Sequence, residues 1–319
     1  MQTVFLHYPD LTIPPLADRA VVAIGMFDGV HRGHRAVIEQ ALAIAHHEDL
    51  PCAVFTFVAH PRSVLRSDHP VPLLSPWEEK RRILEQMGVD LLIGAHFTEA
   101  FAEIAPREFI QRILQEQLKA RHVVIGYNFA FGFKQAGDVD TLRAFSTEAG
   151  FDVTVLPPQS EGSEAISSTR IRELLATGQI DEANLLLGRP YTMTGLVVHG
   201  DQRGRTLGFP TANLSCDEQK LWPAYGVYVA RARWGDRVLP CVVNLGMRPT
   251  FDPPQRRIEA YLLDFEGNLY GETMTLEFLQ RLRPEQAFSS ISELIEQIQR
   301  DVALARERLS LRAEVPRMA

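Results

Sequence analysis

The length and composition of the chain indicate a globular protein of about two domains. It has 319 residues, of which 45% are hydrophobic and 23% charged, close to the average for globular proteins. With 21 Gly and 20 Pro, the chain has too few of these residues to be fibrous or disordered. A net charge of −7 without a sustained basic run argues against a nucleic-acid-binding protein.

The cysteine pattern and the hydropathy of the sequence indicate in which cellular compartment the protein is expected. The three cysteines, Cys52, Cys216 and Cys241, have neither C-x-x-C spacing nor a paired His motif, which argues against a disulfide framework and a structural zinc site. Residues 1–19 lack the basic and apolar regions of a signal peptide, and no stretch approaches the ~20 apolar residues of a membrane helix. We therefore expect a reduced, cytoplasmic protein with no membrane partner.

The first half of the chain alternates strand-like and helix-like segments. Apolar runs that predict strands lie at Ala20–Phe27, Cys52–Phe57, Asp90–Ala95, His122–Gly126 and Asp152–Leu156. Stretches that predict amphipathic helices lie at Gly33–His46, Pro76–Met87, Pro106–Lys119 and Val139–Gly150, followed by two shorter helices at Thr169–Thr177 and Asp181–Leu187. Continuous apolar strands separated by helices predict a Rossmann-like α/β domain with a parallel sheet.

From Tyr191 onward the pattern changes to short β-rich segments separated by turn signals. The predicted strands are Thr194–His199, Gly226–Trp234, Val238–Leu245, Ile258–Phe265 and Glu272–Leu279. One helix, from Ser289 to about Arg308, follows them. This pattern predicts an all-β C-terminal domain, an antiparallel barrel or sandwich, with a C-terminal helix. We expect two domains, 1–186 and 187–319.

A glycine-rich string, G-M-F-D-G-V-H-R-G-H at 25–34, joins the first predicted strand to the first helix. Its glycines let the backbone approach a ligand closely, and the helix start offers free N–H groups to an anion. His31 and His34 are three positions apart, so both can lie on one side of the first turn and donate to a polyphosphate. The chain has no P-loop and no G-x-G-x-x-G after a strand. The string therefore predicts nucleotide binding through histidine and backbone, with ordinary surface histidines as the alternative.

A second string of the same domain, S-S-T-R-I-R at 167–172, starts a predicted helix. Ser168 or Thr169 would cap this helix, and Arg172 would project one turn further on. Hydroxyls, free N–H groups and a guanidinium would then converge on phosphate oxygens. Taken alone, the string is also typical of an ordinary capped helix.

The β-rich half contains a third string, G-D-Q-R-G-R-T-L-G-F-P-T-A-N at 200–213. Its glycines and arginines, Gly200, Gly204 and Arg205 among them, suit a flexible loop that folds over phosphates. Thr211 and Asn213 are two positions apart, so in extended backbone both side chains point the same way. A hydroxyl and an amide oxygen suit Mg²⁺. As an isolated pattern the string is also typical of a hairpin loop.

Together these strings resemble the bacterial bifunctional riboflavin kinase/FAD synthetase family. G-x-F-D-G-x-H-x-G-H is similar to the signature of a nucleotidyltransferase superfamily, and G-x-x-x-G-R-x-L-G-F-P-T-A-N is similar to that of riboflavin kinases. Similar segments cover nearly the whole chain, including F-T-F at 55–57, G-Y-N-F-A-F-G at 126–132, N-L-G-M-R-P-T-F at 244–251, I-E-A-Y at 258–261 and L-R-P-E at 282–285.

The resemblance implies two consecutive reactions that both use ATP and Mg²⁺. The C-terminal domain would phosphorylate riboflavin to FMN, and the N-terminal domain would transfer an adenylyl group from a second ATP to FMN, giving FAD and pyrophosphate. Glu259 matches the family's catalytic base, which would take the proton of the ribityl alcohol. The resemblance also places Asn128 near the nucleotide, whereas Ala130 stands where a larger polar residue is often found. Further residues expected at the nucleotide, flavin or phosphate are Gly25, Phe27, Asp28 and Arg283.

Three alternatives remain open at this point. The chain could be a riboflavin kinase whose first domain has lost adenylyl transfer, or a flavin-storage or flavin-sensing protein without turnover. It could also be a different nucleotidyltransferase fused to a β-barrel binding module. In each case the expected partners are small molecules (riboflavin, FMN, FAD and ATP in the main interpretation), and self-association is left undecided.

Overall fold

The structure, a computed structural model, describes residues 1–11, 19–65, 68, 70–200, 203–248 and 255–313. The chain separates into two compact units, Met1–Ser168 and Thr169–Ala319. This division lies before the last two helices of the first predicted domain, which group with the barrel. The compact units therefore differ from the predicted domains, and the boundary between 186 and 187, which refers to functional domains, stays a prediction.

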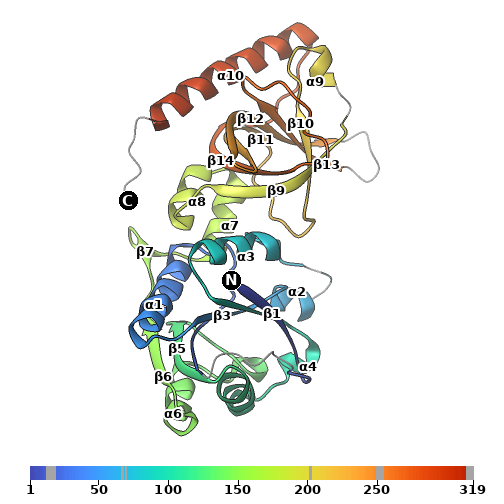
Figure 1. The fold of residues 1–319 in the computed structure, drawn as a ribbon. Coiled ribbons are helices and arrows are strands. Elements are labelled where there is room, and N and C mark those ends of the chain that lie inside the picture. The colour runs from blue at the N-terminus through green and yellow to red at the C-terminus, as the bar shows by residue number, and fades with distance from the viewer. Residues whose placement is uncertain (12–18, 66–67, 69, 201–202, 249–254, 314–319) are drawn as a thin grey trace. The chain divides into compact units, whose positions relative to one another are not determined.

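The first unit is built on a six-stranded parallel sheet (Figure 1). The strand order is β1-β4-β3-β2-β5-β6, and every neighbouring pair is parallel. The strands are β1 (Gln2–His7), β2 (Ala20–Ile24), β3 (Cys52–Phe57), β4 (Leu91–His96), β5 (Ala120–Gly126) and β6 (Asp152–Leu156). The predicted parallel sheet is confirmed. Strand β1, which the sequence analysis did not predict, adds an edge next to β4.

Helices cover both faces of this sheet. They are α1 (Arg32–Glu48), α2 (Pro61–Leu65), α3 (Trp77–Gln86), α4 (Glu99–Ala102), α5 (Pro106–Glu108), the π-helix η1 (Phe109–Gln117), the 3₁₀-helix η2 (Phe133–Gln135) and α6 (Val139–Ala149). Val21 and Ala23 of β2 pack in the cluster that contains α1 and α3, whereas Val22 and Ile24 pack in the cluster of η1 and α6. Because successive side chains of a strand point to opposite faces, a strand covered on both sides has to be continuously apolar.

The strand order creates a topological switch point between β2 and β5. From β2 the chain moves outward through β3 to β4, then returns to the other side of β2 to form β5. In open α/β sheets, ligands bind beyond the carboxyl ends of the strands at such a point. The loops that follow β2 and β5 therefore locate the candidate site of this unit.

The second unit is a closed barrel of six antiparallel strands in the order β10-β13-β12-β11-β14-β9. The strands are β9 (Tyr191–Val198), β10 (Ala212–Cys216), β11 (Gly226–Trp234), β12 (Arg237–Arg248), β13 (Gln255–Leu262) and β14 (Thr273–Arg283). Closure pairs every strand on both sides and leaves no sheet edge. The predicted antiparallel barrel is confirmed, and β10 is a strand that the sequence analysis read only as part of a loop motif.

The second unit also contains helices that pack against the barrel strands. The helices are α7 (Ser168–Thr177), α8 (Ile180–Leu187), α9 (Arg203–Thr206) and α10 (Ile291–Ala313); a small hairpin of β7 (Ser160–Glu161) and β8 (Glu164–Ala165) precedes α7. Helix α10 lies along β11 and β12 (Figure 1), where Ala305 packs with Val227 and Val229. Asn184 of α8 donates to the carbonyl of Phe278 at 2.8 Å, which holds α8 on β14.

Candidate active sites

The first candidate site is the loop between β2 and α1, which carries the G-M-F-D-G-V-H-R-G-H string. Its backbone takes left-handed φ angles at Phe27 (46°), Gly29 (84°) and Val30 (39°). Such angles are unfavourable for a bulky or β-branched residue, so the surroundings have to hold the loop in place. Phe27 and Val30 are almost completely buried, and a Cβ on Gly25 would lie 2.9 Å from the Phe27 ring. Gly25 and Phe27 thus shape the loop, and their contact with a nucleotide stays a prediction.

Asp28 fastens this loop from within. Its carboxylate is buried and accepts hydrogen bonds from the backbone N–H groups of Leu74 at 3.1 Å and Ser75 at 3.0 Å. The Ser75 hydroxyl in turn accepts from the N–H of Gly29 at 2.7 Å. A buried carboxylate needs such donors to offset its desolvation. The structure therefore gives Asp28 a positioning role, and its predicted contact with a ligand stays a prediction.

A buried lysine, Lys80 of α3, holds the same loop and was missed as a functional residue. Its Nζ donates to the carbonyls of Met26 and Phe57, both at 3.0 Å, and to Oγ1 of Thr56 at 3.3 Å. Burial lowers the pKa of Lys80 to about 8, against the opposing effect of the Asp28 charge. A lysine in the first turns of a helix is usually solvated, so the sequence offered little signal.

The two histidines of the string lie together at the start of α1. His31 caps the helix, its Nδ1 accepting from the N–H of His34 at 3.3 Å. The two rings stack with centroids 3.6 Å apart and an interplanar angle of 18°, and Phe27 meets His34 edge-on at 5.4 Å. A Cβ on Gly33 would come within 3.2 Å of the His31 ring, so glycine leaves room for this packing. The pair sits where helix N–H groups and the helix dipole favour an anion.

The start of α7 reaches the same loop. The Ser168 hydroxyl donates to the carbonyl of Asp28 at 2.9 Å, which brings together two strings that lie 140 residues apart in the chain. Arg32 of α1 forms an ion pair with Glu161 of the β7–β8 hairpin. Thr169 and Arg172 belong to the second unit, and their predicted contacts with phosphate stay predictions.

Asn128 follows β5, on the other side of the switch point. It lies in a turn in which the N–H of Phe129 donates to the carbonyl of Gly126 at 3.1 Å. Asn128 and Ala130 are exposed, while Phe129 stacks on Phe131 with centroids 5.3 Å apart. The switch point thus places Asn128 and the histidine pair after neighbouring strands, as a shared nucleotide site requires.

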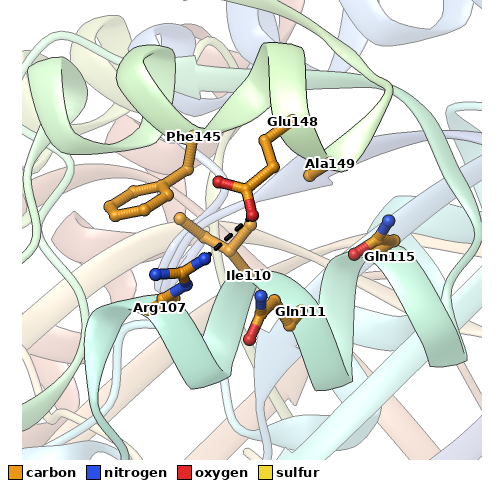
Figure 2. A pocket seen from close by; sticks show the side chains of 7 residues that line it. All are labelled: Arg107, Ile110, Gln111, Gln115, Phe145, Glu148 and Ala149. Atoms are coloured by element: carbon orange, nitrogen blue, oxygen red, sulfur yellow. Dashed lines mark hydrogen bonds and ion pairs between the residues drawn. The ribbon is translucent and has the colours of Figure 1, made fainter.

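A pocket of the first unit lies away from these residues, between η1 and α6 (Figure 2). It has a volume of about 250 Å³. Arg107 and Glu148 form a 2.8 Å ion pair across it, and the Arg107 guanidinium lies 5.4 Å from the centre of the Phe145 ring. None of the residues predicted from the sequence lines this pocket, and we assign it no part in the reactions.

The second candidate site lies on neighbouring strands of the barrel, β10 and β13. Asn213 and Glu259 are directly opposite each other in the register, and the Thr211 hydroxyl donates to Glu259 Oε1 at 3.3 Å. Ala212 and Ala260, which are buried, point to the other face of the same strands. The structure therefore brings the predicted base and both predicted metal ligands together in one patch.

An arginine that the sequence analysis passed over completes this patch. Arg257 precedes Glu259 by two residues, so both side chains lie on one face of β13. Its NH2 lies 2.5 Å from Glu259 Oε1, and its Nε donates to Asn213 Oδ1 at 3.1 Å. Only 20% of each of the Arg257 and Glu259 side chains is exposed. The contact with Asn213 depends on the register of β10 and β13, which a local motif does not reveal.

Two glycines of the third string fit closely around these side chains. A Cβ on Gly200 would lie 2.3 Å from Asn213 Nδ2, and one on Gly204 would lie 2.4 Å from the carbonyl oxygen of Phe209. At Gly204 the neighbour is backbone, so glycine is required by close approach, whereas a side chain at Gly200 would displace the Asn213 amide. The side chain of Arg205 lies outside the described residues, and its predicted contact with phosphate stays a prediction.

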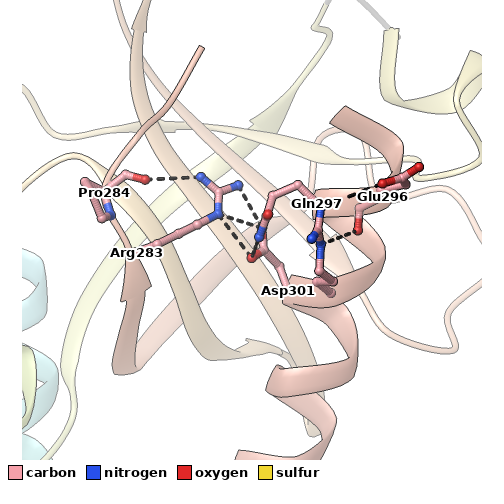
Figure 3. Close-up of polar contacts among 6 residues, drawn as sticks. Arg283, Pro284, Glu296, Gln297 and Asp301 are labelled. Carbon is pink, nitrogen blue, oxygen red and sulfur yellow. Dashed lines mark hydrogen bonds and ion pairs between the residues drawn. The ribbon is translucent and has the colours of Figure 1, made fainter. Parts of the chain in front are cut away.

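Arg283 is tied to α10 (Figure 3). Its guanidinium donates to both carboxylate oxygens of Asp301 at 2.8–3.1 Å and to the carbonyl of Pro284 at 3.1 Å. Gln297 donates to the same carboxylate at 2.9 Å. Asp301 is buried, so this charge-assisted pair fastens α10 to the end of β14. The predicted contact of Arg283 with flavin or phosphate stays a prediction.

Two protein-family models match the chain, one in each half, and each match contains one of the two candidate sites. A family model described as FAD synthetase matches residues 13–170, and one described as riboflavin kinase matches residues 187–309. The first match contains the histidine pair and the second contains the Thr211–Asn213–Glu259 patch.

Curated relatives extend the similarity over nearly the whole chain. A bifunctional riboflavin kinase/FMN adenylyltransferase of Listeria monocytogenes is 40% identical over 303 residues, covering 94% of this chain and 96% of that protein. Its counterpart of the same name in Bacillus subtilis is 39% identical over 306 residues, and that in Escherichia coli is 38% identical over 288 residues.

A solved structure has the same fold over both units. It is the crystal structure of a protein from Streptococcus pneumoniae described as a macrolide-efflux protein, with a TM-score of 0.87 and 31% identity, covering 96% of this chain and 99% of that chain. Within the described part of this chain, no helix has the length and apolar character needed to cross a membrane. The family models and the relatives at 38–40% identity show that the chain belongs to the bifunctional riboflavin kinase/FMN adenylyltransferase family.

Proposed function

We propose that this chain makes FMN from riboflavin and ATP at the barrel, and FAD from FMN and a second ATP at the first unit. Family membership over nearly the whole chain supports both reactions. The observation that carries the proposal is that Thr211, Asn213 and Glu259 lie together on the barrel, and that His31, His34 and Ser168 lie at one loop of the first unit. We keep 1–186 and 187–319 as the functional domains; the riboflavin kinase match, which begins at residue 187, supports the start of the second.

At the barrel, Glu259 would act as general base on the ribityl 5′-hydroxyl of riboflavin. An alcohol is far from ionised at neutral pH, so a carboxylate within hydrogen-bond reach takes its proton as the bond to the γ-phosphorus forms. Thr211 already donates to Glu259 and fixes the direction of its carboxylate. The Gly200 and Gly204 segment would let the backbone come close to the phosphates.

Thr211 and Asn213 would hold Mg²⁺ beside this base. Their hydroxyl and amide oxygens belong to the hard ligands that Mg²⁺ prefers, and they converge with Glu259 on one patch. A barrel-bound Mg²⁺ would neutralise charge on the transferred phosphoryl group. This donor set relies on neutral oxygens; groups of three or more His, Cys, Asp or Glu that could hold a metal are not found among the described residues.

At the first unit, the start of α1 would bind the triphosphate of the second ATP. The FMN phosphate is already an anionic nucleophile near neutral pH, so this reaction needs no general base. In-line displacement at phosphorus depends on positioning and on charge stabilisation. In this unit, His31, His34 and Ser168 would stabilise the triphosphate and the departing pyrophosphate, and Asn128 would lie near the nucleotide. Thr169 and Arg172 stay predicted phosphate ligands. We place both reactions in the cytoplasm, with Mg²⁺ required in each.

Incubating the full chain with ATP, Mg²⁺ and riboflavin tests this proposal. Chromatography should show FMN first and FAD afterwards, with release of ADP and then of pyrophosphate. A reaction that stops at FMN would identify a riboflavin kinase alone. Bound flavin without any release of ADP or pyrophosphate would identify a storage or sensing protein and contradict the proposal.

A further inference from the structure

The guanidinium of Arg257 contacts both the proposed base, Glu259, and a proposed metal ligand, Asn213. Arg257 lies 2.5 Å from Glu259 Oε1 through its NH2 and donates to Asn213 Oδ1 through its Nε at 3.1 Å. Arg257 sits diagonally across the β10–β13 register from Asn213, and Glu259 is directly opposite Asn213. The planar fork of an arginine suits this bridge, because two of its N–H groups reach two acceptors at once.

One of these two oxygen atoms, Oδ1 of Asn213, would also be needed by a metal ion. Asn213 has one amide oxygen, and Nε of Arg257 donates to it. A divalent cation at Asn213 would face the positive charge of Arg257 at close range, in a place where only 20% of the arginine side chain is exposed. Like charges at such a distance repel each other strongly. The guanidinium and the metal therefore compete for the patch.

We propose that Arg257 is a resident cation of the barrel site, which pairs with Glu259 and Asn213 until the metal–nucleotide complex displaces it. This inference rests on the proposed function, because it takes Thr211 and Asn213 as the metal ligands. Before displacement, the arginine offsets the negative charge of Glu259 and keeps the oxygens of the two strands facing each other. Arg257 would thus set how much free metal ion the kinase reaction requires.

A second Arg–Glu pair on the barrel supplies a matched control. Arg233 of β11 donates to Glu277 of β14 through Nε at 3.1 Å and NH2 at 3.0 Å. This pair also joins neighbouring strands, and it involves none of Thr211, Asn213 and Glu259. Arg233→Gln removes an arginine of the same kind without touching the candidate site.

The test is a titration of the full chain with Mn²⁺ in the presence of ADP, with free Mn²⁺ followed by electron paramagnetic resonance. Two variants identify the Mn²⁺ bound at the barrel: its binding should be lost in Asn213→Ala and become tighter in Asn213→Asp. Mn²⁺ bound in the first unit should not respond to either variant. Arg257→Gln should lower the free Mn²⁺ concentration at half-saturation of the barrel site about fivefold, because a repelling charge is gone. Arg257→Lys keeps the charge and should stay within about twofold of the wild type, as should Arg233→Gln.

The outcomes separate the two proposals. Weaker or unchanged Mn²⁺ binding in Arg257→Gln, with Asn213→Asp still tightening it, would overturn the role of Arg257 and leave the metal site standing. Weaker binding would mean that Arg257 holds phosphate oxygens of the bound nucleotide instead. If neither Asn213 variant changed Mn²⁺ binding, the metal assignment and the role of Arg257 would both be wrong. A general loss of packing would not tighten metal binding, so the expected result also excludes a purely structural arginine.

Discussion

Individual residues were predictable where a short string places them, and not where the fold does. His31, His34, Thr211 and Asn213 stand in strings that carry the family resemblance. The rings of the two histidines stack, and Thr211 and Asn213 both lie beside Glu259. Lys80 and Arg257 are different, because Lys80 donates to a carbonyl of a distant loop and Arg257 reaches Asn213 on the neighbouring strand. Nothing in the residues beside Lys80 indicates that its ammonium group is buried.

Lys80→Met should weaken adenylyl transfer and leave riboflavin phosphorylation unchanged. The ammonium group of Lys80 donates to the Met26 carbonyl at 3.0 Å, in the loop that leads to His31 and His34. Removing an ammonium group that three acceptors share should therefore displace the loop and reduce kcat for FAD formation by about tenfold or more. Steady-state assays of the two reactions on one protein sample measure the difference. Equal loss of both activities would contradict this role for Lys80.

The same variant tests the buried charge through pH. The pKa of Lys80 is about 8 in the folded protein and near 10.5 when unfolded, so between these values the unfolded chain binds more protons. The wild type should therefore gain free energy of unfolding relative to Lys80→Met as the pH rises from about 8 to about 10.5. Urea unfolding at several pH values measures this. A constant difference across that window would show that Lys80 is not desolvated as described.

At the scale of elements, alternation and periodicity predicted the main strands and helices of both units. Strands β1 and β10 were not predicted: β1 lies before the first alternating segments, and β10 begins inside the third string, whose glycines indicate a loop. It expected a helix over Pro106–Lys119, and most of that helix is a π-helix. Apolar spacing shows which face a helix buries, but a change in its winding depends on backbone hydrogen bonds that the spacing does not encode.

Helix α10 should depend on one ion pair for its attachment to the barrel. Asp301→Asn leaves the Arg283 guanidinium, 17% exposed, without its charged partner. Breaking a buried pair from one side costs about 3 kcal/mol of unfolding free energy. Urea unfolding of the variant measures the loss. Asp264→Asn, which breaks the exposed Arg306–Asp264 pair of the same helix, is the control and should cost clearly less, because solvent screens that pair. Equal losses would contradict the anchoring role of Asp301.

At the scale of the whole molecule, the account depends on two reactions being separated between two compact units. The order of domains was predictable, because the character of the sequence changes from alternating helix and strand to short strands. The position of the division was harder to predict, since α7 and α8 read as helices of an α/β domain while the structure groups them with the barrel. The apolar spacing of such short helices shows which face is buried, but it does not show which unit that face packs against.

The most direct test of this separation compares two variants of the full chain, first singly and then mixed. Glu259→Gln should lose riboflavin phosphorylation by about 10²–10⁴-fold and still convert FMN to FAD, because only the barrel reaction needs a general base. The double variant His31→Ala/His34→Ala should make FMN from riboflavin and no FAD. An equal mixture of the two, supplied with riboflavin, ATP and Mg²⁺, should again form FAD. If either folded variant lost both activities together, the assignment of one reaction to each unit would be wrong.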